Sequence, residues 1–157
     1  MKKIKIITAL VVAGFLVNCS GNDDAQDTTK PTINLSIPDG FPTSCAVVQR
    51  GNVFPFKAQF SDNDQLGSYS VAFHSNFDHH SHDTEIDACP LDPIKTPVND
   101  WREIFTFNIP ENLQEYTATH DIEIPNDIDT GDYHVEIKVT DANGWSTLKG
   151  ISIKIVD

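Results

Sequence analysis

Apolar and polar residues alternate along almost the whole chain beyond residue 30. The clearest run contains Tyr133, Val135, Ile137 and Val139, with a polar or charged residue between each neighbouring pair. Such a period of two places successive side chains on opposite faces of a β-strand, and no window of ten or more residues shows a helical period. We therefore predict strands at residues 33–37, 54–60, 69–73, 105–109, 122–124, 133–139 and 146–156.

Turns rich in Asp, Asn, Pro and Gly separate these runs, notably at residues 61–64, 124–127 and 141–144. About seven short strands joined by polar turns favour an all-β, immunoglobulin-like β-sandwich with strands A to G, and a jelly roll or another sandwich topology is the alternative. Tyr133, at the start of the sixth strand, is predicted to form a tyrosine corner, in which the phenol bonds to nearby backbone.

The connection between strands C and D is long, from residue 75 to about residue 100. Loops of this length in compact domains are usually functional or disordered. The chain has three cysteines. If Cys19 carries a lipid, as its surroundings predict below, Cys45 and Cys89 remain as an even pair, which in an oxidising compartment indicates a disulfide. Closing a loop of roughly 45 residues would stabilise the fold by about 4 kcal/mol and would pin this connection. The alternative is that one thiol serves as a metal ligand.

The N-terminus has the pattern of an export signal: three lysines precede an apolar segment that is too short to span a bilayer comfortably. The sequence Leu16-Val17-Asn18-Cys19 resembles a bacterial lipobox, although Asn18 replaces the usual Gly, Ala or Ser. We predict a lipoprotein signal peptide over residues 1–18, a lipid on Cys19, a flexible acidic tether over 19–30 and one sandwich domain over 31–157.

These features predict an outer-membrane lipoprotein that is attached to the membrane through its lipid. The acidic residues after Cys19 resemble signals for export to the cell surface, and they fit a periplasmic linker equally well. The formal net charge is −12, and removal of the signal peptide's lysines makes it more negative. Such a surface repels phosphate backbones, which argues against nucleic-acid binding, and attracts cations. A protein of the cell envelope is the expected partner.

Four of the six histidines lie between His74 and His82. Imidazole is the commonest side-chain ligand for transition metals. If the alternate apolar residues of strands C and F face the core, His74 and His134 both face outward. Because C and F are antiparallel neighbours in an immunoglobulin-like sheet, the end of C lies beside the start of F. The sequence therefore predicts that His74 and His134 are neighbours on one sheet face.

We expect zinc, copper or nickel to bind here, with His74, His80, His82 and His134 as the favoured ligands. His79 and Asp78 rank below them, and Asp83 is a further carboxylate in reach. The alternatives are a polar loop whose histidines bond to carboxylates, and a pH-responsive patch. His120 is predicted to be a half-buried structural histidine of strand E. The sequence Asp62-Asn63-Asp64 lacks the spaced ligands of a dedicated calcium loop and is predicted to be a turn.

The run from His74 to His82, together with Gly131-Asp132-Tyr133-His134, resembles a family of bacterial lipoproteins known as domain of unknown function 4625. The resemblance extends from about Lys30 to the C-terminus. It implies a lipid-anchored β-sandwich and no established activity. We expect a non-enzymatic envelope protein with a transition-metal site, because no catalytic signature is present. The alternative is an adhesion or accessory module of a surface uptake system without a metal. A metal-dependent hydrolase is the third hypothesis.

Overall fold

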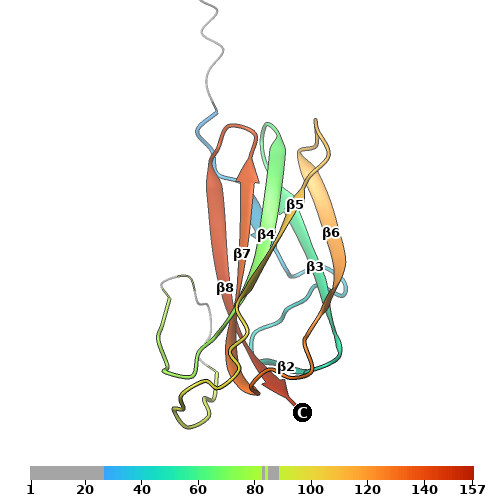
Figure 1. Cartoon of the computed structure of the whole chain (residues 1–157). Helices are drawn as coiled ribbons and strands as arrows, with labels where there is room; N and C mark the ends of the chain where they lie inside the picture. Colours follow the sequence, from blue (N-terminus) through green and yellow to red (C-terminus); the bar gives the residue numbers. More distant parts are fainter. Residues whose placement is uncertain (1–26, 83, 85–88) are drawn as a thin grey trace, which may run out of the picture.

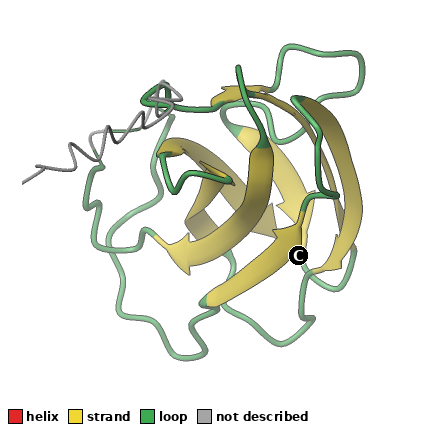
Figure 2. Ribbon diagram, turned by 90° about the horizontal axis from the view of Figure 1, so that it is seen from above, coloured by secondary structure: helices red, strands yellow, loops and turns green. Residues whose placement is uncertain are grey.

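The computed structural model describes residues 27–82, 84 and 89–157. The described residues form eight β-strands and no helix (Figures 1 and 2). Among them there is no helix that could span a bilayer. The strands are β1 (Thr32–Asn34), β2 (Ala46–Gln49), β3 (Val53–Ser61), β4 (Leu66–Ser75), β5 (Glu103–Asn108), β6 (Glu115–Glu123), β7 (Gly131–Asp141) and β8 (Ser146–Val156).

The strands form two sheets that pack face to face. One sheet has the order β1-β3-β6 and the other has the order β2-β8-β7-β4-β5. All neighbours are antiparallel except β2 and β8, which are parallel. The all-β sandwich predicted from the alternating pattern is therefore confirmed.

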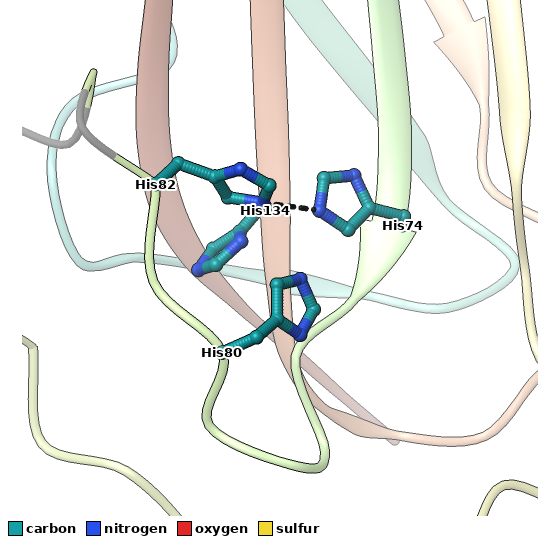
Figure 3. A group of neighbouring side chains, drawn as sticks. All are labelled: His74, His80, His82 and His134. Atoms are coloured by element: carbon teal, nitrogen blue, oxygen red, sulfur yellow. Dashed lines mark hydrogen bonds between the residues drawn. The ribbon is translucent and has the colours of Figure 1, made fainter.

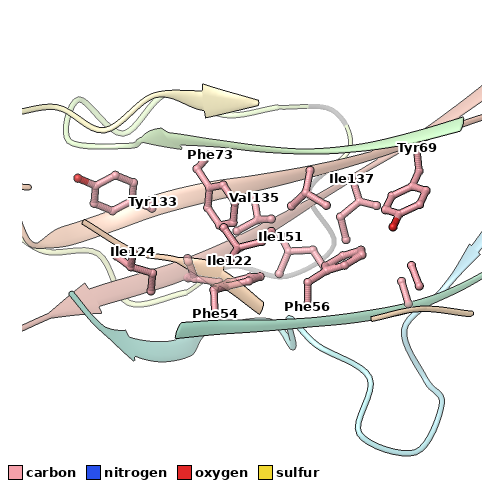
Figure 4. Close-up of a cluster of buried hydrophobic side chains, with 14 of the residues drawn as sticks. Phe54, Phe56, Tyr69, Phe73, Ile122, Ile124, Tyr133, Val135, Ile137 and Ile151 are labelled. Atoms are coloured by element: carbon pink, nitrogen blue, oxygen red, sulfur yellow. The ribbon is translucent and has the colours of Figure 1, made fainter. Parts of the chain in front are cut away.

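Alternation explains the core between the sheets. In β3 the side chains at even positions from Phe54 to Phe60 are fully buried, and the side chains between them are more exposed. The same pattern in β4 and β7 directs Tyr69, Val71 and Phe73 and the odd positions 133–139 inward (Figure 4). Burial of apolar surface stabilises the fold by about 25 cal/mol per Å². A shift of one residue in strand pairing would turn these side chains to solvent and lose that free energy, so the register of each strand is strongly specified.

Two details differ from the expected seven-strand arrangement. The additional strand, β2, has only four residues, so its alternating pattern is too short to be distinguished from that of a loop. Its partner β8 is about a hundred residues away in the sequence. The strand labelled D in the sequence is β5, which pairs with β4 in the five-stranded sheet. In the seven-strand immunoglobulin arrangement, strand D instead belongs to the sheet opposite strand C.

The long connection, now between β4 and β5, is fixed to the sandwich at several points. The Cys45–Cys89 disulfide forms as predicted, with the Cα atoms 5.5 Å apart. The Lys154 ammonium lies 2.6 Å from Asp92 and 3.3 Å from the buried Asp132. The Asp92 N–H also donates to Asp132 at 2.7 Å. These contacts hold the loop across the ends of β7 and β8.

The tyrosine corner is also present. The Tyr133 hydroxyl donates to the Asp129 carbonyl at 2.7 Å, and burial raises the pKa of this phenol. The Asp129 carboxylate in turn accepts the N–H groups of Val98 and Asn99, at 2.6 and 2.9 Å. Hydrogen bonding to these two amides lowers the pKa of Asp129. The corner thus connects the end of the long loop to the start of β7.

The predicted signal peptide, the lipid on Cys19 and residues 19–26 of the tether lie outside the described residues, and they stay predictions. Asp83, in the histidine loop, also lies outside them.

Candidate metal centre

His74 and His134 are directly opposite each other in the antiparallel pair β4–β7. Their neighbours Phe73 and Val135 point into the core, so both imidazoles are on the outer face of the five-stranded sheet. Their ring centroids are 5.2 Å apart. The prediction that these two histidines, sixty residues apart in sequence, share one sheet face is confirmed.

The loop after β4 brings His80 and His82 onto this pair (Figure 3). Among the four rings, every pair of centroids lies 4.9–5.3 Å apart. One ring nitrogen from each histidine can be chosen so that all four lie within 4.8 Å of one another. The Nε2 atoms of His74 and His82 are only 3.0 Å apart and share a hydrogen bond. Four imidazoles therefore converge on one point.

This spacing is close to what a tetrahedral ion requires. Zinc binds imidazole nitrogen at about 2.0–2.1 Å, so the nitrogens of a tetrahedral set lie about 3.3 Å from each other. The His74–His82 separation of 3.0 Å is already near that value. The remaining nitrogens lie within 4.8 Å of one another, at most about 1.5 Å more than that value. The donor set fits a transition metal, since imidazole suits zinc, copper and nickel.

The centre is closed toward the sheet and open toward solvent on one side. His134 is only 1% exposed, although strand parity directs it outward, because the other three imidazoles pack around it. His74, His80 and His82 are half-buried. They border a depression of about 510 Å³, which Arg102 and Glu136 also line. An ion can therefore reach the nitrogens from solvent.

Two carboxylates contact the outer edges of the ring cluster. Asp78 Oδ1 is 2.5 Å from His80 Nδ1, and this hydrogen bond lowers the pKa of Asp78. Glu136 Oε1 is 3.9 Å from His82 Nδ1, which is too far for a hydrogen bond, so Glu136 acts on His82 through its charge alone. A carboxylate that accepts the Nδ1 proton fixes the tautomer and leaves Nε2 as the metal ligand. Asp78, predicted as a lower-ranked ligand, is thus placed to orient His80 and is not part of the converging set.

The surroundings of His74 favour its neutral form. Burial lowers the pKa of His74, the nearby His82, His80 and Arg102 act in the same direction, and Glu136 opposes them. Metal ligation requires the neutral imidazole, so a lowered pKa favours binding near neutral pH. Asp78 and Glu136 supply negative charge that would offset a bound cation.

His79 points away from the centre. Its Nε2 lies 2.8 Å from the Asp92 carbonyl, and its backbone has a positive φ of 60°. Because the chain reverses here, the side chain of His79 points toward Asp92 while the side chain of the adjacent His80 points toward the cluster. Among the predicted ligands, the four ranked first come together and His79 does not. Cys45 and Cys89 are joined to each other, so neither thiol is available as a ligand.

His120 has the structural role that its strand position predicted. It is half-buried in β6, stacks on Phe107 with the ring centroids 3.9 Å apart, and hydrogen-bonds the Tyr69 hydroxyl. It belongs to the three-stranded sheet, whereas the histidine cluster is on the outer face of the other sheet.

Sequence reasoning did not single out Glu136. The signal that could have found it is parity: Glu136 follows His134 by two residues in β7, so both side chains are on the same face. In a chain with 23 acidic residues, a single glutamate does not stand out without that argument.

Comparison with known families matches residues 17–156 to one family, described as Domain of unknown function (DUF4625). A search of curated proteins finds no match to the chain. The match covers the entire sandwich, both strands that carry His74 and His134, and the loop that carries His80 and His82. This chain belongs to the DUF4625 family.

Proposed function

We propose that the protein is a lipid-anchored protein of the cell envelope that binds a transition-metal ion at His74, His80, His82 and His134 and is not an enzyme. The main support for this proposal is the convergence of four imidazoles, two from paired strands and two from a loop that the Cys45–Cys89 disulfide holds. Chance enrichment of histidine in the loop does not explain why the cluster also includes a buried histidine from a distant strand.

The number of ligands favours binding over catalysis. Catalytic zinc sites have three protein ligands and keep the fourth position for water or substrate, whereas in structural sites all four ligands come from the protein. Here four imidazoles can occupy all positions of a tetrahedral ion. A hydrolase would need one of the four to stay off the metal.

The chemistry of the ligands restricts the metal. Nitrogen donors suit zinc, copper(II) and nickel, whereas calcium and magnesium take oxygen ligands. Both cysteines of the domain are in the disulfide, so no thiolate is present to favour copper(I). The acidic surface attracts cations toward the site. Together these features support capture or buffering of a divalent transition metal outside the cytoplasm.

The test is metal binding by the full chain. After treatment with a chelator, the protein is dialysed separately against zinc, copper(II) and nickel, and bound metal is measured by mass spectrometry. We expect one equivalent, a rise in Tm, and loss of both in the His74→Ala/His134→Ala variant. His79→Ala is the matched control, because it removes a histidine of the same loop that points away from the centre.

Two outcomes contradict the proposal. In the first, the wild-type chain retains no metal and its Tm does not respond to any of the three ions. In the second, the zinc-loaded protein hydrolyses ester or peptide substrates and the His74→Ala variant does not, which would make the centre catalytic.

A second function is favoured by the exposed face of the long loop. Leu91, Ile94 and Val98 are 45%, 67% and 93% exposed. Apolar side chains grouped on one loop suit contact with another protein, as an adhesion or accessory module requires. Replacing Ile94 and Val98 with serine would abolish capture of an envelope partner in this case and leave metal binding unchanged.

A further inference from the structure

Three carboxylates converge at the end of the sandwich opposite the histidine cluster. Asp27 precedes β1, Asp62 is in the turn between β3 and β4, and Asp141 ends β7. One oxygen from each can be chosen so that the three lie within 4.8 Å of one another. The three residues come from segments that are far apart in sequence, so the local sequence around Asp62 shows only a turn.

Each carboxylate has one oxygen held by the backbone and one that is not. The held oxygens are Asp27 Oδ1, Asp62 Oδ2 and Asp141 Oδ1, which accept N–H groups at 2.9, 3.0 and 2.8 Å. The opposite oxygens, Asp27 Oδ2, Asp62 Oδ1 and Asp141 Oδ2, are buried and accept no hydrogen bond from the described residues. The turns therefore fix each side chain and leave its second oxygen available.

The burial of Asp141 distinguishes this cluster from a group of acidic residues on the surface. It is only 4% exposed, and its Oδ2 lies in the cluster with no hydrogen-bond donor among the described residues. Within that part of the chain, no lysine or arginine forms an ion pair with any of the three aspartates. A buried carboxylate beside two others is costly unless a cation compensates the charge.

We propose that Asp27, Asp62 and Asp141 bind a calcium ion. Oxygen ligands select hard cations, and three carboxylates from three segments suit the large, flexible shell of calcium. Magnesium keeps several waters and usually takes only one or two carboxylates. Backbone carbonyls and waters complete the shell. This site is separate from the histidine centre and does not depend on the proposed function of that centre.

The site would attach the N-terminal segment to the sandwich. The Trp145 indole already donates to the Asp27 carbonyl at 2.9 Å, and the Asn63 amide donates to Asp27 Oδ1 at 3.0 Å. Next to the site, β4 approaches β7 closely at Gly67, where an added Cβ would be 2.8 Å from the Asp141 carbonyl oxygen. Calcium would thus clamp the segment before β1 onto two turns, at the point where the predicted tether enters the domain.

The first experiment measures calcium binding by the full chain after removal of metals with a chelator. Titration calorimetry is expected to give one site with Kd of about 10⁻⁴–10⁻³ M. At ten times Kd, Tm is expected to rise by about 5 °C. Asp62→Asn and Asp141→Asn keep the side-chain size and are expected to lose this rise. Asp121→Asn, at an exposed position of β6, is the matched control and is expected to retain it.

The order of stability of wild type and Asp141→Asn, measured with and without calcium, distinguishes a cation site from a structural hydrogen bond. Without calcium, Asp141→Asn is expected to be at least as stable as wild type, because it removes one of three repelling charges. With calcium it is expected to be less stable. Equal destabilisation of Asp141→Asn in both conditions, a wild-type Tm that does not respond to calcium, or a magnesium response as large as the calcium response would each overturn the proposal.

Terbium luminescence reports whether the bound ion lies close to Trp145. Trp145 is beside Asp27, so terbium bound here is expected to show tryptophan-sensitised emission that calcium displaces. Trp145→Phe is expected to lose the emission and keep the calcium-dependent rise in Tm. Emission that persists in Asp141→Asn would place the ion elsewhere and contradict the assignment.

Discussion

The two candidate centres occupy opposite ends of the same pair of strands. His74 lies near the end of β4 and His134 near the start of β7, whereas Asp62 precedes β4 and Asp141 ends β7. In Figure 1 the long loop of the histidine centre lies at the lower end, and the β7–β8 turn and the segment before β1 lie at the upper end. Asp141 follows His134 by seven positions along β7, which corresponds to about 23 Å.

The two ends are built in different ways. At the histidine end, a pair of facing strand residues supplies two imidazoles, and the long loop that the disulfide holds supplies the other two. At the aspartate end, two short turns and the N-terminal segment supply one carboxylate each. The first centre should therefore depend on how the long loop is held, and the second should not. Their ligands also differ, since imidazole suits transition metals and carboxylate suits calcium.

The largest expected effect comes from removing the disulfide. Cys45→Ser/Cys89→Ser opens a crosslink between residues separated by 44 positions, which should cost about 4 kcal/mol in the free energy of unfolding. Zinc affinity should fall as well, because His80 and His82 are on the released loop, while calcium affinity should stay unchanged. Urea unfolding and calorimetric titration with each ion measure these effects. A matched fall in both affinities would mean that the two ends are not independent.

A smaller effect is expected from the carboxylates behind the imidazoles. Asp78→Ala should lower zinc affinity by about 10- to 100-fold, because His80 loses the acceptor that orients its ring. Glu136→Gln should lower the affinity less, because it removes only a negative charge 3.9 Å from His82. The protein should otherwise fold normally and bind calcium as before. Competition with a zinc indicator gives the affinity, and Asp121→Asn controls for the loss of one negative charge. An unchanged zinc affinity in both variants would show that the rings are oriented by packing alone.

The smallest expected effect is the coupling between the two centres. Groups more than about 7–10 Å apart without shared partners usually contribute additively within about 0.3–0.5 kcal/mol. The stabilisation by zinc and calcium together should therefore equal the sum of the two separate stabilisations. Unfolding in zinc, in calcium and in both ions measures this. A clear excess or deficit would show that β4 and β7 transmit a change from one end to the other.

Much of the histidine centre could be predicted from the sequence. The alternation in β4 and β7 placed His74 and His134 on the outer face, and the antiparallel pairing of these strands brought them together. The orientations within the loop could not be predicted, because no period constrains them. The positive φ at His79 and the hydrogen bond that His80 donates to Asp78 decide which side chains of that run turn toward the sheet.

The aspartate cluster was missed for a related reason. The sequence Asp62-Asn63-Asp64 predicts a turn, which the structure has, and that local pattern contains only one member of the cluster. Asp27 and Asp141 meet it only after β1, β3, β4 and β7 are paired. In the same way, the four-residue strand β2 could not be recognised until its parallel partner β8 was in place.

The sequence by itself determined the sandwich, because a period of two directs every second side chain into the core, where the loss of apolar contact with water fixes the register. It also determined the disulfide pair and the partnership of His74 with His134, which follow from cysteine number and strand parity. Only the tertiary structure decided which loop histidines complete the centre, which carboxylates orient them and which distant aspartates meet. These choices depend on turns and on contacts between remote segments, and no local periodicity encodes them.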